Sequence, residues 1–174
     1  MGDMQDELTM ISQSATRAAS LLQFYRIAFG AVHAEDAPIP RQALQAEART
    51  LIDSGRIKLD WPDSTGPELS RAEARLLCQL LLCCRAALGL RGTVSVDLPT
   101  ATALPMRVGA QAIGAGDGEA SLNSDVVALF EEAPDVTALP PRLIEFVLVR
   151  SSADGLGVNL RVEKTQAALT VTAV

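Results

Sequence analysis

Apolar residues recur at alternating intervals of three and four along the first thirty residues of the chain. This spacing is typical of a helix whose one face packs lengthwise against other helices. We call this face the seam, and its positions are Leu8, Ile11, Ala15, Ala18, Leu22, Tyr25 and Phe29. After Ser20 a second apolar stripe runs beside the seam, so we expect the C-terminal half of the helix to be covered on more than one side. The second stripe consists of Leu21, Phe24, Ile27 and Ala28.

The helix is expected to end at Gly30 or shortly after, within a first region of residues 1–33 that serves dimerisation or a helical bundle. A polar linker follows at residues 34–39. Plain dimerisation or core packing is the commonest use of such a seam, and the spacing alone does not separate that use from a bundle.

Residues 40–174 predict an α+β domain. Pro40 is suited to open a helix that Gly55 closes, and Ser70 with Glu73 has the spacing of a capping box at the start of a second helix. Further helices are expected near 125–132 and 141–152. Strands are expected at 56–61, 93–98, 106–110, 158–164 and 168–174, where apolar and polar residues alternate. This order predicts a two-layer sandwich with the helices on one face of the sheet.

The helix beginning at Ser70 is apolar nearly all round in its middle, so we expect it to be the most buried element. It carries all three cysteines of the chain, Cys78, Cys83 and Cys84. Their spacing matches no zinc or redox motif, and we expect buried free thiols.

Charge and composition narrow the class of protein. The 174 residues carry a formal net charge of −6, which argues against a nucleic-acid partner. The longest apolar run, Leu76–Cys84, is too short to cross a membrane, and the acidic N-terminus does not resemble a signal peptide. We therefore expect a cytoplasmic protein without membrane association. No catalytic triad, phosphate-binding loop or metal-ligand pair is recognisable, so no metal is expected.

Residues 22–31 read LQFYRIAFGA. This segment resembles the second bundle helix of the alphaproteobacterial histidine phosphotransferases of the ChpT type, and weaker similarity continues to the C-terminus. The resemblance implies a homodimer whose paired helical hairpins form a four-helix bundle, followed by a degenerate histidine-kinase-like ATP-binding domain. It also implies a phosphorelay function, in which phosphoryl groups pass between response-regulator receiver domains.

One departure from that family concerns the phosphorylated histidine. The family carries it in a His-Asp dipeptide on the first bundle helix, whereas the single histidine of this chain, His33, follows the second. We expect His33 to be an exposed residue near the helix end and not a phosphate acceptor. We further expect Met1 to lie in the turn between the two bundle helices, so that the sequence as written lacks the first, histidine-bearing helix.

A second departure concerns the nucleotide site. The asparagine motif of the kinases corresponds to residues 79–84, where Gln79 and Cys83 replace the asparagines. A thiol is a poor ligand for magnesium, which prefers hard oxygen donors. The aspartate that reads adenine corresponds to Ala112, and only Gly114 and Gly116 remain of the glycine box. We therefore expect no nucleotide cofactor and no ATP-dependent kinase activity.

Three hypotheses follow. The first is a histidine phosphotransfer protein whose receiver-docking residues are Arg17, Gln23 and Arg26, the polar positions beside the seam. The second is a catalytically inactive module that docks receivers or only dimerises. The third is an unrelated α+β binding domain whose first helix oligomerises. The bare pattern also allows the three polar side chains to form an ordinary solvated helix face.

Overall fold

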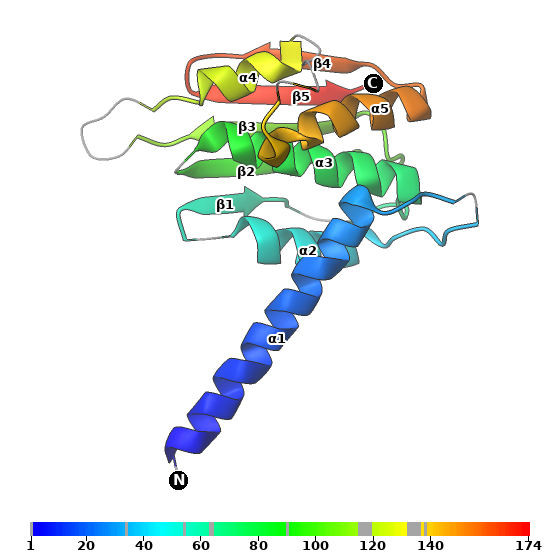
Figure 1. Cartoon of the computed structure of the whole chain (residues 1–174). Coiled ribbons are helices and arrows are strands. Elements are labelled where there is room, and N and C mark those ends of the chain that lie inside the picture. The colour runs from blue at the N-terminus through cyan, green and yellow to red at the C-terminus, as the bar shows by residue number, and fades with distance from the viewer. Residues whose placement is uncertain are drawn as a thin grey trace.

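The computed structural model describes residues 2–33, 35–53, 55–62, 65–89, 91–114, 120–131, 137 and 139–174. A long helix, α1 (Gly2–Phe29), projects from an α+β domain, and its N-terminus is the end farthest from that domain (Figure 1). The helices of the domain are α2 (Arg41–Ile52), α3 (Arg71–Leu88), α4 (Ser124–Glu131), the short 3₁₀ helix η1 (Pro141–Leu143) and α5 (Glu145–Leu156). The strands are β1 (Ile57–Asp60), β2 (Gly92–Asp97), β3 (Met106–Ala112), β4 (Leu160–Lys164) and β5 (Ala168–Ala173). The predicted α+β class is confirmed.

The five strands form one mixed sheet in the order β1-β2-β3-β5-β4. β1 pairs in parallel with β2, and every other pair is antiparallel. Alternation of side chains gives the sheet one apolar and one polar face. Val94, Val108 and Val171 are buried on the face that the helices cover. Arg107 and Arg161 are exposed at alternate positions of their strands, on the opposite face. The domain is therefore the predicted two-layer sandwich.

α3 is the central element of the core, as predicted. All its residues from Leu76 to Cys84 are buried, the most exposed of them at only 9%. The capping box at its start is present: Ser70 N–H donates to Glu73 Oε2 at 2.7 Å, and Glu73 N–H donates to Ser70 Oγ at 3.3 Å. Its end falls at Gly89, whose φ of 65° favours glycine.

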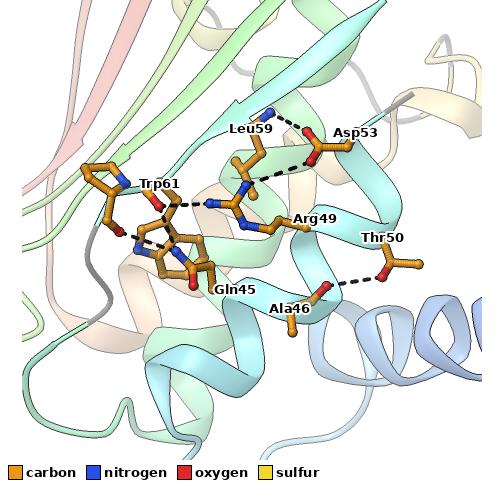
Figure 2. Close-up of polar contacts among 8 residues, drawn as sticks. Gln45, Ala46, Arg49, Thr50, Asp53, Leu59 and Trp61 are labelled. Atoms are coloured by element: carbon orange, nitrogen blue, oxygen red, sulfur yellow. Dashed lines mark hydrogen bonds and ion pairs between the residues drawn. The ribbon is translucent and has the colours of Figure 1, made fainter. Parts of the chain in front are cut away.

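The turn from α2 into β1 is held by polar side chains of α2 and of Asp53, which follows the helix (Figure 2). Asp53 Oδ1 accepts a hydrogen bond of 2.7 Å from Leu59 N–H. Gln45 Nε2 and Arg49 Nη2 both donate to the backbone oxygen of Trp61, at 2.7 and 3.2 Å. These contacts join the helix to the C-terminal half of β1 and to Trp61 just after it, and Trp61 lies in the core with 2% of its surface exposed.

Arg41, at the start of α2, is buried without a carboxylate partner among the described residues. Its guanidinium instead donates to four backbone oxygens, those of Thr65, Pro67, Pro99 and Thr102, at 2.8 to 3.2 Å. Burial lowers the pKa of Arg41 from its ordinary value, and the Glu73 carboxylate partly offsets that effect. One side chain therefore joins two loops that lie far apart in the sequence.

Several boundaries differ from the sequence expectations by one or more residues, and those of α5 and β3 have a clear physical reason. α5 starts after η1 and continues to Leu156, four residues beyond the predicted end, because buried Ala153 still packs on the core and Gly157 closes the helix with φ of 67°. β3 continues to Ala112, which pairs with Gly92 and is buried at 4% exposure. The supposed first position of the glycine box is therefore the last residue of a strand.

Candidate functional site

The two apolar stripes of α1 have different environments. Phe24, Ile27 and Ala28 of the second stripe are at most 2% exposed, because the C-terminal turns of α1 pack on α2 and α3. The seam is uncovered in the single chain. Leu8, Ile11 and Leu22 are 61 to 66% exposed, and every described side chain from Met4 to Ala19 is exposed. The expectation that the C-terminal half is covered on a second side is confirmed.

The seam ends beside a cavity of about 500 Å³ between α1, α3 and the start of α5. Tyr25 and Phe29 form its wall on the α1 side, with Leu82 and Arg85 of α3 and Ile144 just before α5. Tyr25, Phe29 and Ile144 are among the exposed large apolar side chains. The cavity has a mixed lining, with the charged side chains of Arg85 and Glu145 beside the apolar ones. The exposed apolar helix face that leads to it is typical of a surface that a protein partner covers.

Glu145 is the buried acidic residue of that cavity, with 9% of its surface exposed. Burial raises the pKa of its carboxyl above the ordinary value, and a hydrogen bond to its backbone N–H partly offsets this. The sequence does not reveal this buried position, because Glu145 resembles any acidic residue in the first turn of a helix until the neighbouring helices are known.

The three receiver-docking candidates do not lie on one side of α1. All three are exposed. Nine residues separate Arg17 from Arg26, which is about two and a half turns, so the two side chains project from opposite sides of the helix. Arg17 lies in a polar groove between α1 and α2 with Thr50 and Asp53, whereas Arg26 and Gln23 follow the edge of the seam.

Three residues of the expected degenerate nucleotide site, Gln79, Cys83 and Ala112, are buried in the core, whereas Gly114 is partly exposed after β3. Gln79 Nε2 donates a hydrogen bond of 2.8 Å to Ala28 O, and Gln79 is 2% exposed. Cys83 is fully buried, and Ala112 lies in β3. None of Gln79, Cys83, Ala112 and Gly114 lines the cavity beside the seam. Gly116 lies outside the described residues.

The three thiols are buried and unpaired, as predicted. Desolvation raises the pKa of each, and that of Cys84 rises to about 12. Within the described ranges, no cluster of three or more His, Cys, Asp or Glu residues suits a metal ion.

His33 is exposed four residues beyond the end of α1. Its backbone N–H donates to Asp36 Oδ2 at 2.8 Å, and its backbone oxygen accepts from Asp36 N–H at 3.1 Å. The residue therefore belongs to a turn after the helix and not to the seam.

The family model described as the histidine phosphotransferase C-terminal domain matches residues 41–168. The chain therefore belongs to the histidine phosphotransferase family. Among curated protein sequences the search found no match. Within the described parts of the chain, no helix has both the length and the apolar character that a membrane span requires.

A solved structure of a bacterial phosphotransferase is similar over 100% of this chain and 81% of its own, with 22% identity and a TM-score of 0.69. This likeness shows that the fold is shared. The histidine kinase domain of the blue-light activated kinase from Erythrobacter litoralis EL346 covers 93% of this chain and 72% of its own, at 20% identity and a TM-score of 0.49. A mycobacterial sensor histidine kinase, MprB, covers 79% of this chain and 94% of its own, at 14% identity and a TM-score of 0.49. Both kinase scores are low, so the fold comparison rests on the phosphotransferase.

Proposed function

We propose that this chain is a histidine phosphotransfer protein of a two-component phosphorelay, which passes phosphoryl groups between receiver domains. Family membership supports a phosphorelay role. The single observation that carries the finer proposal is the uncovered seam of α1, because a soluble domain rarely exposes a contiguous apolar stripe unless a partner covers it.

A second copy of the chain is the proposed cover of the seam. The intervals of three and four residues suit side-by-side helices, and the resemblance to ChpT-type proteins implies a bundle built from two protomers. In this arrangement residues 1–33 form the dimerisation region, residues 34–39 the linker and residues 40–174 the domain without a nucleotide site.

Receiver docking is proposed at the edge of the seam, at Gln23 and Arg26, which flank Leu22 and are exposed in the single chain. The chain carries a net charge of −6, so long-range attraction does not favour an acidic partner. Docking would rest on apolar contact with local help from a cation such as Arg26. Arg17, on the other side of the helix, would reach a receiver only through the groove shared with α2.

The chemistry is a transfer between two acceptor groups. A histidine nitrogen attacks the phosphorus of an aspartyl phosphate, the N–P bond forms, the P–O bond breaks, and the aspartate leaves as a carboxylate. The reverse sequence then passes the phosphoryl group to the second receiver. The protein contributes orientation, which converts a bimolecular step into an effectively unimolecular one. His33 is not proposed as the acceptor, since it lies in an exposed turn bound to Asp36.

Binding to receivers tests the proposal. Receiver domains from the same cells are titrated onto the immobilised chain, and at least one is expected to bind. Arg26→Glu should weaken that binding, whereas the matched variant Arg161→Glu, an exposed arginine on β4, should not. Absence of binding by every receiver, or equal loss in both variants, would refute receiver docking at α1.

The alternative is a module that docks receivers or dimerises without accepting phosphate. The observation favouring it is that His33 is the single histidine of these 174 residues. The alternative predicts receiver binding with no label transferred from a phosphorylated receiver. Transfer of label to the protein isolated from its native cells would exclude it.

A further inference from the structure

Three side chains of α3 bind the end of α1. Arg71, Arg75 and Gln79 are four residues apart from one another, so they lie on one side of the helix. Arg71 Nη2 donates to Arg26 O at 3.3 Å, and Gln79 Nε2 donates to Ala28 O at 2.8 Å. Arg75 Nη2 donates to Gly30 O. We call these three side chains the clasp.

The acceptors of the clasp lie at or just beyond the C-terminus of α1. Ala28 O is among the last four carbonyl oxygens of the helix, Gly30 O follows the helix end, and Arg26 O also accepts from Gly30 N–H at 3.0 Å. The last four carbonyl groups of an α-helix have no partner within the helix, and the helix dipole makes this end favourable for cations. The clasp supplies three donors, two of them from cationic side chains. Gly30 suits this junction, because a Cβ there would lie 2.2 Å from Arg26 O.

The clasp holds only one end of α1. Phe24, Ile27 and Ala28 are buried beside it, whereas the described side chains from Met4 to Ala19 are exposed. The N-terminal part of α1 projects away from the α+β domain (Figure 1). The free part of the helix is about 25–30 Å long at 1.5 Å per residue. A small rotation at the clasp therefore becomes a displacement of several ångströms at the far end of the helix.

We propose that Arg71, Arg75 and Gln79 are positioning residues that make α1 and the α+β domain one rigid body. Gln79 stands where the resemblance to kinases puts a nucleotide-binding asparagine, and its amide is instead committed to Ala28. The element that would hold a nucleotide in a kinase holds the bundle helix in this chain. The consequence for phosphoryl transfer, namely a fixed approach of docked receivers, rests on the proposed function; the clasp itself does not.

Gln79→Leu is the informative variant. It removes the donor to Ala28 O, and it also removes Gln79 Oε1, a buried oxygen without a partner among the described residues. These two effects on stability oppose each other, so the melting temperature should change little. Arg71→Gln, added to Gln79→Leu, removes a second contact of the clasp, the hydrogen bond from partly exposed Arg71 to Arg26 O. It also removes one positive charge from the C-terminal end of α1.

The readout is the distance distribution between spin labels at Ser14→Cys on α1 and Glu163→Cys on β4, both exposed positions. The native thiols are buried and do not compete for the label. Labelled chain is diluted with unlabelled chain so that distances within one protomer are recorded. The background protein should give one narrow distribution, and the double variant Arg71→Gln/Gln79→Leu should broaden it about twofold or more by local loosening.

Two controls separate positioning from general stability. Val171→Ala, in the fully buried part of β5, should lower the melting temperature and leave the distribution narrow. Arg71→Lys, which keeps a cationic donor, should restore most of the narrow distribution in the Gln79→Leu background. An unchanged width in the double variant, or a broad distribution in the background protein, would overturn the proposal. No receiver takes part, so that failure would leave the phosphorelay proposal untouched.

Discussion

Tyr25 and Phe29 stack on each other one turn apart on α1, with 6.0 Å between their ring centroids and 14° between the ring planes. Each residue remains 40% exposed in the single chain. Phe24, whose ring meets Tyr25 edge-on at 6.0 Å, is completely buried. The uncovered seam and the buried second stripe therefore meet at Tyr25, and the stacked pair forms a preformed apolar surface at the junction.

Leu22→Asp tests the seam. In the single chain Leu22 is 66% exposed, so the charge should leave the fold of the α+β domain intact. In a bundle the same charge is buried without a partner, and the dimer should weaken by roughly 100-fold or more. Sedimentation equilibrium measures this change.

Thr16→Asp is the matched control for the seam. Thr16 is exposed on α1 six residues before Leu22, about one and two-thirds turns away, so it faces a different side of the helix. This variant should remain dimeric. A dimeric Leu22→Asp chain would show that the seam is not the dimer interface.

Arg41→Met tests the buried guanidinium. The variant leaves four backbone oxygens without their donor, those of Thr65, Pro67, Pro99 and Thr102. We expect the free energy of unfolding to fall by roughly 3 kcal/mol, because hydrogen bonds to charged groups contribute more than neutral ones. Urea denaturation measures it. Arg41→Lys keeps a cation with fewer donors, so its free energy of unfolding should lie between those of the parent chain and Arg41→Met. A loss below about 0.5 kcal/mol for Arg41→Met would contradict this account.

Glu145→Gln tests the buried carboxyl. Its pKa in the folded state is raised above the ordinary value of 4.5, so the folded chain holds this proton more tightly than the unfolded chain. The contribution of Glu145 to stability is therefore most favourable below pH 4.5 and is lost as the pH rises through the raised pKa. Glutamine removes that loss.

The expected result is a Glu145→Gln variant that gains stability over the parent chain as the pH is raised from 4 to 8, measured by urea denaturation at each pH. Glu163→Gln, at an exposed position of β4, is the matched control for the loss of one carboxylate charge. A gain that is independent of pH would mean that the carboxyl keeps its ordinary pKa.

Nucleotide binding is predicted to be absent. A ligand present at 100 times its dissociation constant stabilises the folded state by about 2.7 kcal/mol, which a thermal melt detects readily. We expect no shift of the melting temperature with millimolar magnesium and ATP, since Gln79 and Cys83 are buried and Ala112 is part of β3. Micromolar binding of a fluorescent ATP analogue would overturn this prediction.

Local patterns were sufficient for most of the fold. The capping box at Ser70 and Glu73, the buried middle of α3 and the alternation in β1 depend on neighbours within a few residues, so the sequence displays them directly. The second apolar stripe of α1 was also legible, because Phe24, Ile27 and Ala28 repeat at helical spacing. The end of α5 was predicted too early because burial of Ala153 depends on the distant elements that cover it.

The polar contacts of the site could not be predicted in the same way. Gln79 meets Ala28 across 51 residues of sequence, and Arg41 meets Thr102 across 61. Neither partner is a side chain with a recognisable chemistry, since both acceptors are backbone oxygens. The sequence therefore shows that Gln79 stands where the kinase motif has an asparagine. Only the fold shows that the Gln79 amide binds the end of α1.

Phosphoryl transfer to the protein isolated from its native cells tests the central claim most directly. The protein is mixed with a receiver domain carrying radiolabelled aspartyl phosphate and then separated from it. Our account predicts that the label moves to the protein and that the new bond is labile in acid and stable in base, as expected of phosphohistidine. Label that stays on the receiver, or that reaches the protein in an acid-stable form, would contradict it.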